Sequence, residues 1–290
     1  MVDGGFCSVM TKYVLGECFR KNFNLHVSYD LTWFKQNSRD CDGELTRELT
    51  FHEVFPGASF EEASTEDIAF YKKYFLYENK KPYKFLEKIL GKPRPMYFDG
   101  YSENWRYFSQ VEDSCRQVFD FGNIALDDEN IHVLNKIKSS SSSLAVHVRR
   151  GDYVNLGLSH LDVEYYLTAI NRVCSCLDEM PVIFFFSDDM QLVKDTLIPL
   201  LPNSVNFHCV EINDVHKGYL DLYLISSCQH QISSNSSFGY WGALLNSNSN
   251  KIVVLPKKWL PNTSSARFEG VETAHSYPNF LLHEKSLLSH

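Results

Sequence analysis

The chain has 290 residues, of which 44% are hydrophobic and 14% aromatic, and a formal net charge of -8 at pH 7. This length allows one large domain or two smaller ones with a sizeable hydrophobic core. The negative charge excludes nucleic acid as a general partner, because binding to a phosphate backbone needs a broad basic surface. No apolar run approaches the roughly 20 residues of a membrane-spanning helix, so we expect no transmembrane segment.

Eight cysteines are scattered along the chain, and none has the paired C-x-x-C spacing of a zinc site. Met1 is followed almost at once by Asp3, Gly4 and Gly5, an opening that does not resemble a secretory signal peptide. We therefore expect a reducing, cytoplasmic setting.

The first half of the chain has the less regular pattern. Gly4 and Gly5 precede an amphipathic stretch at residues 10–19 that predicts a helix. A glycine turn at a helix start can bind an anion through free backbone N–H groups, although a plain turn is the simpler interpretation. Residues 25–29 predict a strand.

Residues 72–94 hold eight lysines and arginines interleaved with large apolar side chains. This composition suits contact with an anionic membrane surface or a lipid-linked substrate, and it suits equally the solvated face of a docked helix. Aromatic residues then cluster at residues 97–101 and 105–108, where they fit either a core or a platform for sugar rings.

A run of serines at residues 139–143 predicts an interdomain linker or a long loop. As a linker it would divide an N-terminal domain, residues 1–138, from a C-terminal domain, residues 144–290. Strand and helix patterns alternate in the second half, with strands predicted at 144–148, 182–186, 205–212, up to 232, and 251–255, and helices at 163–177, 192–201, 220–228 and 239–245. This alternation predicts an α/β domain with a parallel sheet covered on both faces.

Three polar motifs follow predicted strands, at the point where each strand ends. His147-Val-Arg-Arg-Gly-Asp152 follows the first strand of this half, Ser187-Asp-Asp189 follows the second, and Ser233-Ser-Asn-Ser-Ser237 begins a helix after a later one. The carboxyl ends of parallel strands share one edge of the sheet, where open α/β sheets bind their ligands.

The chemistry of these motifs converges on a nucleoside diphosphate. An arginine pair can hold a diphosphate without a metal ion, an Asn-Ser-Ser turn can donate to the same phosphates, and a carboxylate can accept both N–H groups on the edge of guanine. Each motif alone has a simpler explanation: an ion pair between Arg150 and Asp152, or helix caps at Asp188, Asp189 and Asn235. No Walker loop and no G-x-G-x-x-G occurs, which argues against an ordinary ATPase or a dinucleotide enzyme.

These residues resemble the successive motifs of the bacterial α-1,2-fucosyltransferases. The resemblance extends from about Asp99 to Trp259, and the motifs occur in that family's order and spacing: HVRRGDY from His147, FFSDD from Phe185, DLYLISSC from Asp221 with SNSSFGYWG from Ser234, and KIVVLPKKW from Lys251.

The resemblance implies a GT-B architecture, in which two Rossmann-like domains face a cleft, with a parallel sheet in the C-terminal donor domain. It implies inverting transfer of L-fucose from GDP-fucose to the 2-hydroxyl of a terminal β-galactose, on an oligosaccharide or a lipid-linked glycan. No cofactor and no metal ion are expected, and a lipid-linked acceptor would bring the enzyme to the cytoplasmic face of the inner membrane as a peripheral protein.

The same resemblance implies roles for particular residues. Arg149 would hold the diphosphate. From the chemistry of the reaction, rather than from the resemblance, we expect Arg149 to stabilise the charge that develops there and Asp152 to act as a general base or to orient the arginines. Donor contacts are expected from two glycines of the N-terminal loop and from residues of the three strand-end motifs, namely Gly4, Gly5, His147, Arg149, Arg150, Asp188, Asp189, Asn235, Ser236 and Ser237.

The N-terminal loop departs from the family pattern, which usually is Gly-Gly-Leu-Gly-Asn-Gln, whereas this chain has Gly4-Gly-Phe-Cys-Ser-Val9. A late start codon that shortens the opening strand would explain this difference. Three alternatives therefore stay open: a fucosyltransferase of another linkage, a nucleotide- or glycan-binding protein without transfer activity, and a metal-dependent transferase that uses Asp188 and Asp189.

Overall fold

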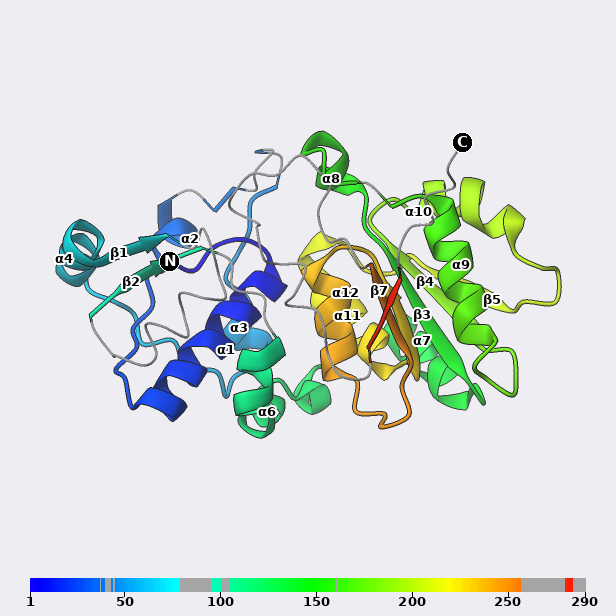
Figure 1. The fold of residues 1–290 in the computed structure, drawn as a ribbon, viewed down its shortest axis with the longest axis horizontal. Helices are drawn as coiled ribbons and strands as arrows, with labels where there is room; N and C mark the ends of the chain where they lie inside the picture. The colour runs from blue at the N-terminus through cyan, green and yellow to red at the C-terminus, as the bar shows by residue number, and fades with distance from the viewer. Residues whose placement is uncertain are drawn as a thin grey trace. The chain divides into compact units, whose positions relative to one another are not determined.

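The computed structural model describes residues 1–36, 38–39, 43, 45–78, 95–100, 105–159, 161–256 and 280–283. The chain divides into two compact units, the first beginning at Met1 and extending to Asn123, and the second beginning at Ile124 (Figure 1). Most of the basic stretch at residues 72–94 lies outside the described residues.

The first unit is built around the long helix α1 (Phe6–Phe23). The helix is buried on more than its predicted apolar face, because Val9, Lys12 and Tyr13 are buried too. The buried Lys12 ammonium lies 2.9 Å from an Asp3 carboxylate oxygen, so the charge is paired. The predicted helix is therefore confirmed, but it is longer and more central than an amphipathic surface helix.

The predicted strand at residues 25–29 is wrong, since Tyr29 makes only an isolated bridge with Glu62. The unit's described sheet has two parallel strands, β1 (Leu76–Glu78) and β2 (Tyr97–Asp99). Its other described helices are α2 (Thr32–Gln36), α3 (Phe51–Val54), α4 (Thr65–Phe75), α6 (Trp105–Val118) and the 3-10 turn η1 (Phe121–Asn123).

Aromatic residues supply much of this unit's core. The ring of Phe51 lies 5.4 Å from that of Phe55 and 5.9 Å from that of Phe119, centroid to centroid. Tyr97 and Phe108, from the aromatic clusters noted in the sequence, are also buried. For these two residues the core interpretation holds.

The second unit contains a six-stranded sheet with the order β5-β4-β3-β6-β7-β8 and parallel pairing throughout. Its strands are β3 (Ser143–Val148), β4 (Val182–Ser187), β5 (Phe207–Val210), β6 (His230–Ser233), β7 (Val253–Pro256) and β8 (Phe280–His283). The predicted α/β class and parallel sheet are confirmed. The three polar motifs that follow predicted strands lie at one edge of this sheet.

Helices cover both faces of this sheet (Figure 1). On one face, α7 (Asp128–Ser139) and α11 (Gly218–Ser227) pack on Ala145 and Phe184; on the other, α9 (Val163–Cys174) packs on Val146 and Phe185. The chain also forms α8 (Gly151–Asn155), α10 (Met190–Leu192), the π-helical turn η2 (Val193–Leu197), the 3-10 turns η3 (Ile198–Leu200) and η4 (Val215–Lys217), and α12 (Ser237–Leu245). Burial on both faces explains why these strands are continuous apolar runs.

The serine run connects two elements of this same unit. Ser139 ends α7 and Ser143 begins β3, so the intervening residues form a helix-to-strand loop. The division between the units lies earlier, between Asn123 and Ile124. Of the two interpretations offered by the sequence, the structure agrees with the loop.

None of the helices in the described ranges combines the length and the apolar character needed to cross a bilayer.

Candidate functional site

Arg149 follows directly after the buried strand β3 and holds its guanidinium between two carboxylates. Its Nη2 donates to Asp152 Oδ1 at 2.6 Å, and its Nη1 lies 2.9 Å from Asp188 Oδ2. The guanidinium carbon also lies 5.4 Å from the centroid of the Tyr153 ring. A long cationic side chain is thus fixed in one orientation, which reduces the conformational entropy it would lose on binding a ligand.

Gly151 is required for this arrangement because Asp188 approaches its Cα closely. A Cβ on this residue would lie 2.4 Å from Asp188 Oδ2, well inside van der Waals contact. The close approach of the Asp188 carboxylate is therefore the reason that this position is glycine.

Burial and the neighbouring carboxylates act in opposite directions on Arg149. Desolvation alone would lower the pKa of its guanidinium, but Asp188 and Asp152 reverse that effect and raise the pKa above its usual value. Arg149 is therefore always charged, and it presents the part of its donor fork that Asp152 and Asp188 do not occupy.

Arg150 contributes first through its backbone, whose N–H donates to Asp188 Oδ1 at 2.8 Å. Its side-chain Nε is buried and has no hydrogen-bond partner among the described residues. The ion pair with Asp152 that the sequence suggested as a simpler explanation is made instead by Arg149. A buried guanidinium N–H without an acceptor is costly, so Arg150 has unused capacity to bind an anion.

His147, the first residue of this motif, is buried beside the neighbouring strand end. Its Nδ1 lies 3.3 Å from Ser234 Oγ, and its ring centroid lies 5.4 Å from that of Phe238. Burial, with a smaller contribution from the Arg149 charge, lowers the pKa of His147 to about 3. The imidazole is therefore neutral near pH 7 and cannot supply a positive charge to a phosphate.

The helix after β6 lies very close to His147 because residue 239 is glycine. A Cβ on Gly239 would lie 2.1 Å from Ser233 Oγ and 2.8 Å from His147 Nδ1. Tyr165, on α9, donates its hydroxyl to the carbonyl oxygen of Ser233 at 2.7 Å. The β6–α12 turn thus depends on the close approach at Gly239 and on the Tyr165 hydrogen bond, and neither residue was predicted from the sequence to have a role here.

The residues of this turn that were predicted to contact the donor already form hydrogen bonds to other protein groups. Asn235 is buried and donates its side-chain N–H to the carbonyl oxygen of Leu158 at 3.0 Å. Ser236 caps α12 by accepting from the backbone N–H of Phe238 at 3.3 Å. Ser237, the first residue of α12, is only partly buried. Asn235 therefore ties the loop after α8 to this turn, and the cap lies at Ser236 rather than at Asn235.

Asp188 and Asp189 differ although they are adjacent. Asp188 contacts Arg149 and the Arg150 backbone, whereas Asp189 caps α10 by accepting from the backbone N–H of Leu192 at 3.1 Å. The helix-cap interpretation thus holds for Asp189 and not for Asp188.

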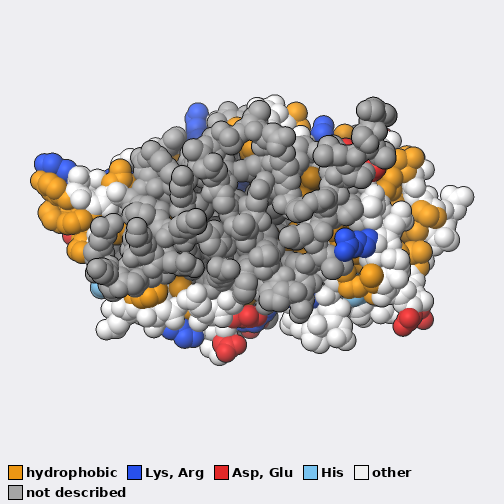
Figure 2. All heavy atoms as spheres, viewed as in Figure 1, with side chains coloured by type: hydrophobic (Ala, Val, Ile, Leu, Met, Phe, Trp, Pro, Cys, Tyr) orange, Lys and Arg blue, Asp and Glu red, His pale blue; other side chains and the backbone are white. Residues whose placement is uncertain are grey.

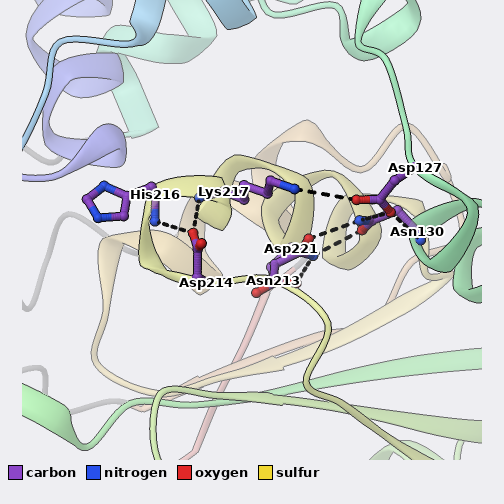
Figure 3. A network of polar contacts seen from close by, with 7 residues as sticks. All are labelled: Asp127, Asn130, Asn213, Asp214, His216, Lys217 and Asp221. Carbon is purple, nitrogen blue, oxygen red and sulfur yellow. Dashed lines mark hydrogen bonds and ion pairs between the residues drawn. The ribbon is translucent and has the colours of Figure 1, made fainter.

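A further carboxyl group, for which no role was predicted from the sequence, lies beyond the carboxyl end of β5. Asp221, in the first turn of α11, accepts from Asn213 Nδ2 at 2.7 Å, and Asn213 in turn exchanges amide hydrogen bonds with Asn130 (Figure 3). Burial, partly offset by that hydrogen bond, raises the pKa of Asp221 to about 6. In the sequence, the feature that could have drawn attention to Asp221 is an acidic residue in the first turn of an otherwise apolar helix.

Figure 3 shows how this network joins three segments, with Asp127 and Asn130 at the start of α7, Asn213 and Asp214 after β5, and Lys217 and Asp221 near the start of α11. Because Asn213 and Asn130 are satisfied by each other, the network fixes the loop after β5 relative to both helices.

Gly4 and Gly5 lie in the first unit, at the start of α1. Gly5 is the residue before the helix, and no side chain caps the helix there. The guanidinium carbon of Arg47 would lie 3.9 Å from a Cβ on Gly5. A cationic side chain beside the start of α1 is compatible with the anion-binding role expected of this loop.

Comparison with known proteins gives a family match over most of the chain. The sequence profile of glycosyl transferase family 11 matches residues 69–276. The O-antigen biosynthesis glycosyltransferase WbnK of Escherichia coli is 31% identical over 144 residues, which cover 48% of this chain and 46% of that protein. An alpha-1,2-colitosyltransferase of Escherichia coli is 30% identical over 177 residues, 59% of each chain. The match thus spans about half the length of these curated relatives.

Two solved fucosyltransferases are similar at low identity. POFUT1 in complex with GDP has 11% identity and a TM-score of 0.47, over 87% of this chain and 95% of that one. The NodZ alpha-1,6-fucosyltransferase co-crystallised with GDP has 16% identity and a TM-score of 0.41, over 84% and 90%. Because the family profile covers well over half of its residues, the chain belongs to glycosyl transferase family 11.

Proposed function

We propose that this glycosyltransferase transfers L-fucose from GDP-fucose to the 2-hydroxyl of a terminal β-galactose. The observation that carries the proposal is the Arg149 guanidinium, fixed between Asp152 and Asp188 at the carboxyl end of the central strand. Family membership supports the reaction class, and the relative named as an alpha-1,2-colitosyltransferase supports the linkage.

The reaction is a single displacement with inversion at C1 of the donor sugar. The acceptor oxygen forms a bond to C1 while the bond from C1 to the β-phosphate oxygen breaks, and the bonding electron pair leaves with GDP. The acceptor hydroxyl loses its proton to a base. Arg149 stabilises the charge that grows on the β-phosphate, and this interaction is stronger in the transition state than in the ground state.

Two cationic side chains carry the donor-binding proposal. Arg149 offers the guanidinium N–H groups that its two carboxylates leave unused, and Arg150 offers its unpaired Nε. Guanidinium N–H groups of this kind can bind a diphosphate without a divalent cation. We therefore propose a reaction that needs neither a metal ion nor a cofactor.

Asp152 is better suited to orienting Arg149 than to removing a proton. Its Oδ1 accepts from Arg149 at 2.6 Å, so this oxygen is already engaged by the guanidinium that it orients. Of the two roles that the sequence left open, we propose the orienting one. The general base is then a group other than Asp152.

The donor sugar has a second candidate. Colitose is the 3-deoxy counterpart of fucose, and one relative is named for its transfer. With either sugar the leaving group would be GDP, so the proposed role of Arg149 would be the same. We further propose a glycan acceptor built for a surface polysaccharide, in line with the relative named for O-antigen biosynthesis, and action at the cytoplasmic face of a membrane.

The test is to incubate the purified protein with GDP-fucose or GDP-colitose and a panel of β-galactosides, with and without EDTA. Product mass and methylation analysis then give the sugar and its linkage. Fucose at the galactose 2-position, formed equally in EDTA, is the expected result.

Other outcomes separate the alternatives. Transfer to another hydroxyl of the acceptor would contradict the proposed α-1,2 linkage. Activity that is lost in EDTA and restored by Mn²⁺ would contradict the proposed metal independence. Binding of GDP without transfer to any acceptor would indicate a binding protein.

A further inference from the structure

Helix α4 presents aromatic side chains to solvent on its outer face. Phe70 is 51% exposed and Tyr74 is 58% exposed, and their ring centroids lie 5.1 Å apart. Leu76, directly after the helix, is 48% exposed. No residue of α4 is buried. Surface helices normally turn polar side chains outward, so this apolar outer face requires an explanation.

The orientation of α4 is fixed by contacts on its inner face. The Lys72 ammonium lies 3.2 Å from Asp30 Oδ2 and 5.0 Å from the centroid of the Tyr97 ring. Ile68, Tyr71 and Phe75, at helical spacing around Lys72, are half-buried. Because this side of the helix is docked, Phe70 and Tyr74 point away from the first unit.

A cationic side chain accompanies the aromatic pair. Lys73 is exposed, and its ammonium lies 4.9 Å from the centroid of the Tyr74 ring. Figure 2 shows hydrophobic side chains and a Lys or Arg side chain gathered over the region where Figure 1 places α4. Aromatic rings beside lysine form the composition of helices that lie in the interface of a membrane.

The first turn of α4 is acidic, with Glu66 and Asp67, but the charge of the sequence from its last turn onward favours an anionic lipid surface. Residues 72–94 hold eight lysines and arginines against two glutamates, in a chain whose formal net charge is -8. Juxtamembrane basic segments of this kind are attracted to anionic lipids, whereas an excess of acidic residues elsewhere is repelled. The excess of positive charge is thus concentrated in the stretch of sequence that begins on α4.

We propose that the outer face of α4, defined by Phe70, Lys73, Tyr74 and Leu76, is a docking surface for an anionic lipid bilayer. The aromatic rings enter the headgroup region, and Lys73 contacts the lipid phosphates. This peripheral contact does not depend on the donor or acceptor of the transfer reaction.

The experiment is sedimentation of the full chain with vesicles of phosphatidylcholine, alone or mixed with phosphatidylglycerol. We expect binding to the mixed vesicles, weakened by salt, and little binding to phosphatidylcholine alone. The double variant Phe70→Ser/Tyr74→Ser should bind about 10-fold more weakly because it loses two interfacial aromatic anchors. Lys73→Glu should weaken binding by a similar factor of about 10, since it reverses a charge near the lipid surface.

The matched control is Met180→Ser/Leu200→Ser, which removes two apolar side chains of similar exposure from the second unit. Its vesicle binding should equal that of the wild type, and circular dichroism melting should show that all variants remain folded.

Absence of vesicle binding, equal binding to both lipid mixtures, or unchanged binding by the α4 variants would each overturn the proposal. A dimer in solution that dissociates in the α4 double variant, without vesicle binding by the wild type, would assign the face to a second copy instead. GDP binding, measured in parallel, separates these outcomes from failure of the proposed transfer reaction.

Discussion

The carboxyl ends of β3 and β6 lie on neighbouring strands but are built differently. At the end of β3, the charged side chains of Arg149 and Asp152 meet Asp188 from the end of β4 at a partly exposed position. After β6, uncharged polar residues from Ser233 to Ser236 are buried and bonded largely to protein groups. The first strand end therefore offers charge to a ligand, and the second provides the framework that keeps this charge in place.

The largest effect is expected at the charged strand end. Arg149→Ala should lower kcat at least ~10²-fold, because a preorganised charge opposite the leaving phosphate is lost. Arg149→Lys should recover only part of the rate, since an ammonium lacks the planar fork. Initial rates of transfer from GDP-fucose measure both. Arg172→Ala, on the exposed side of α9, is the control; near-normal turnover in Arg149→Ala would remove Arg149 from the mechanism.

A substitution at the end of β6 should change the stability of the fold rather than the rate of transfer. Gly239→Ala places a Cβ 2.1 Å from Ser233 Oγ, and the required shift should lower the free energy of unfolding by about 1–3 kcal/mol. Urea denaturation measures this change. An unchanged midpoint would mean that α12 can move away from β6 at no cost.

Gly151→Ala sharpens the comparison because it introduces the same small group at the charged end. The new Cβ would lie 2.4 Å from Asp188 Oδ2, so the carboxylate must move and Arg149 must lose one partner. We expect turnover to fall roughly 10-fold, as misplacement of a catalytic group does, with a smaller loss of stability than in Gly239→Ala. The opposite ranking of the two variants would contradict the division of roles.

The pH dependence of stability provides a further distinction. The pKa of His147 is about 3 in the folded chain, below its unfolded value of about 6.5, so the unfolded chain binds the proton first and stability falls as the pH drops through 6.5. Asp221 has the opposite sign, because its folded pKa of about 6 lies above the unfolded value and its stabilisation is lost as the pH rises.

Asp221→Asn removes this opposing contribution. Between about pH 6.5 and 5.5 the variant should lose about 0.5–1 kcal/mol more stability on acidification than the wild type does. Urea denaturation at both pH values gives the difference. Equal slopes for the two proteins would mean that Asp221 does not titrate in this range.

A small effect, on stability alone, is expected from Asp189, which caps α10. Asp189→Ala should lower the free energy of unfolding by about 0.5–1 kcal/mol, as loss of a helix cap does, and should leave KM for the donor unchanged. A large rise in KM with unchanged stability would return Asp189 to donor binding.

The sequence was most informative where local pattern and long-range structure agree. The strands at residues 144–148 and 182–186 are buried on both faces, in agreement with the parallel sheet predicted from the alternation of strand and helix patterns. The positions of Arg149 and Asp188 follow from where these strands end. The strand predicted at residues 25–29 had only a weak local pattern, and tertiary context overrode it.

Other features could not be derived from sequence because they depend on which atoms meet. Adjacent carboxylates cannot be told apart by spacing, yet Asp188 contacts Arg149 while Asp189 caps a helix. Likewise, Asn235 was expected to face the donor, but it is committed to the carbonyl oxygen of Leu158. The requirement for glycine at position 239 arises only from the close approach of α12 to β6.

The strand order has a consequence for how the protein matures. The site draws on residues that follow β3, β4 and β6, and β6 lies beside β3 although more than one helix and two strands separate them along the chain. Such pairing of distant segments makes folding slow relative to proteins with local contacts. Because the site is complete only after β6 has paired with β3, a nucleotide sugar that binds there would select the completed sheet and shift the population toward it. Donor concentration in the cell would then influence how much of the newly made protein survives, as well as how fast it works.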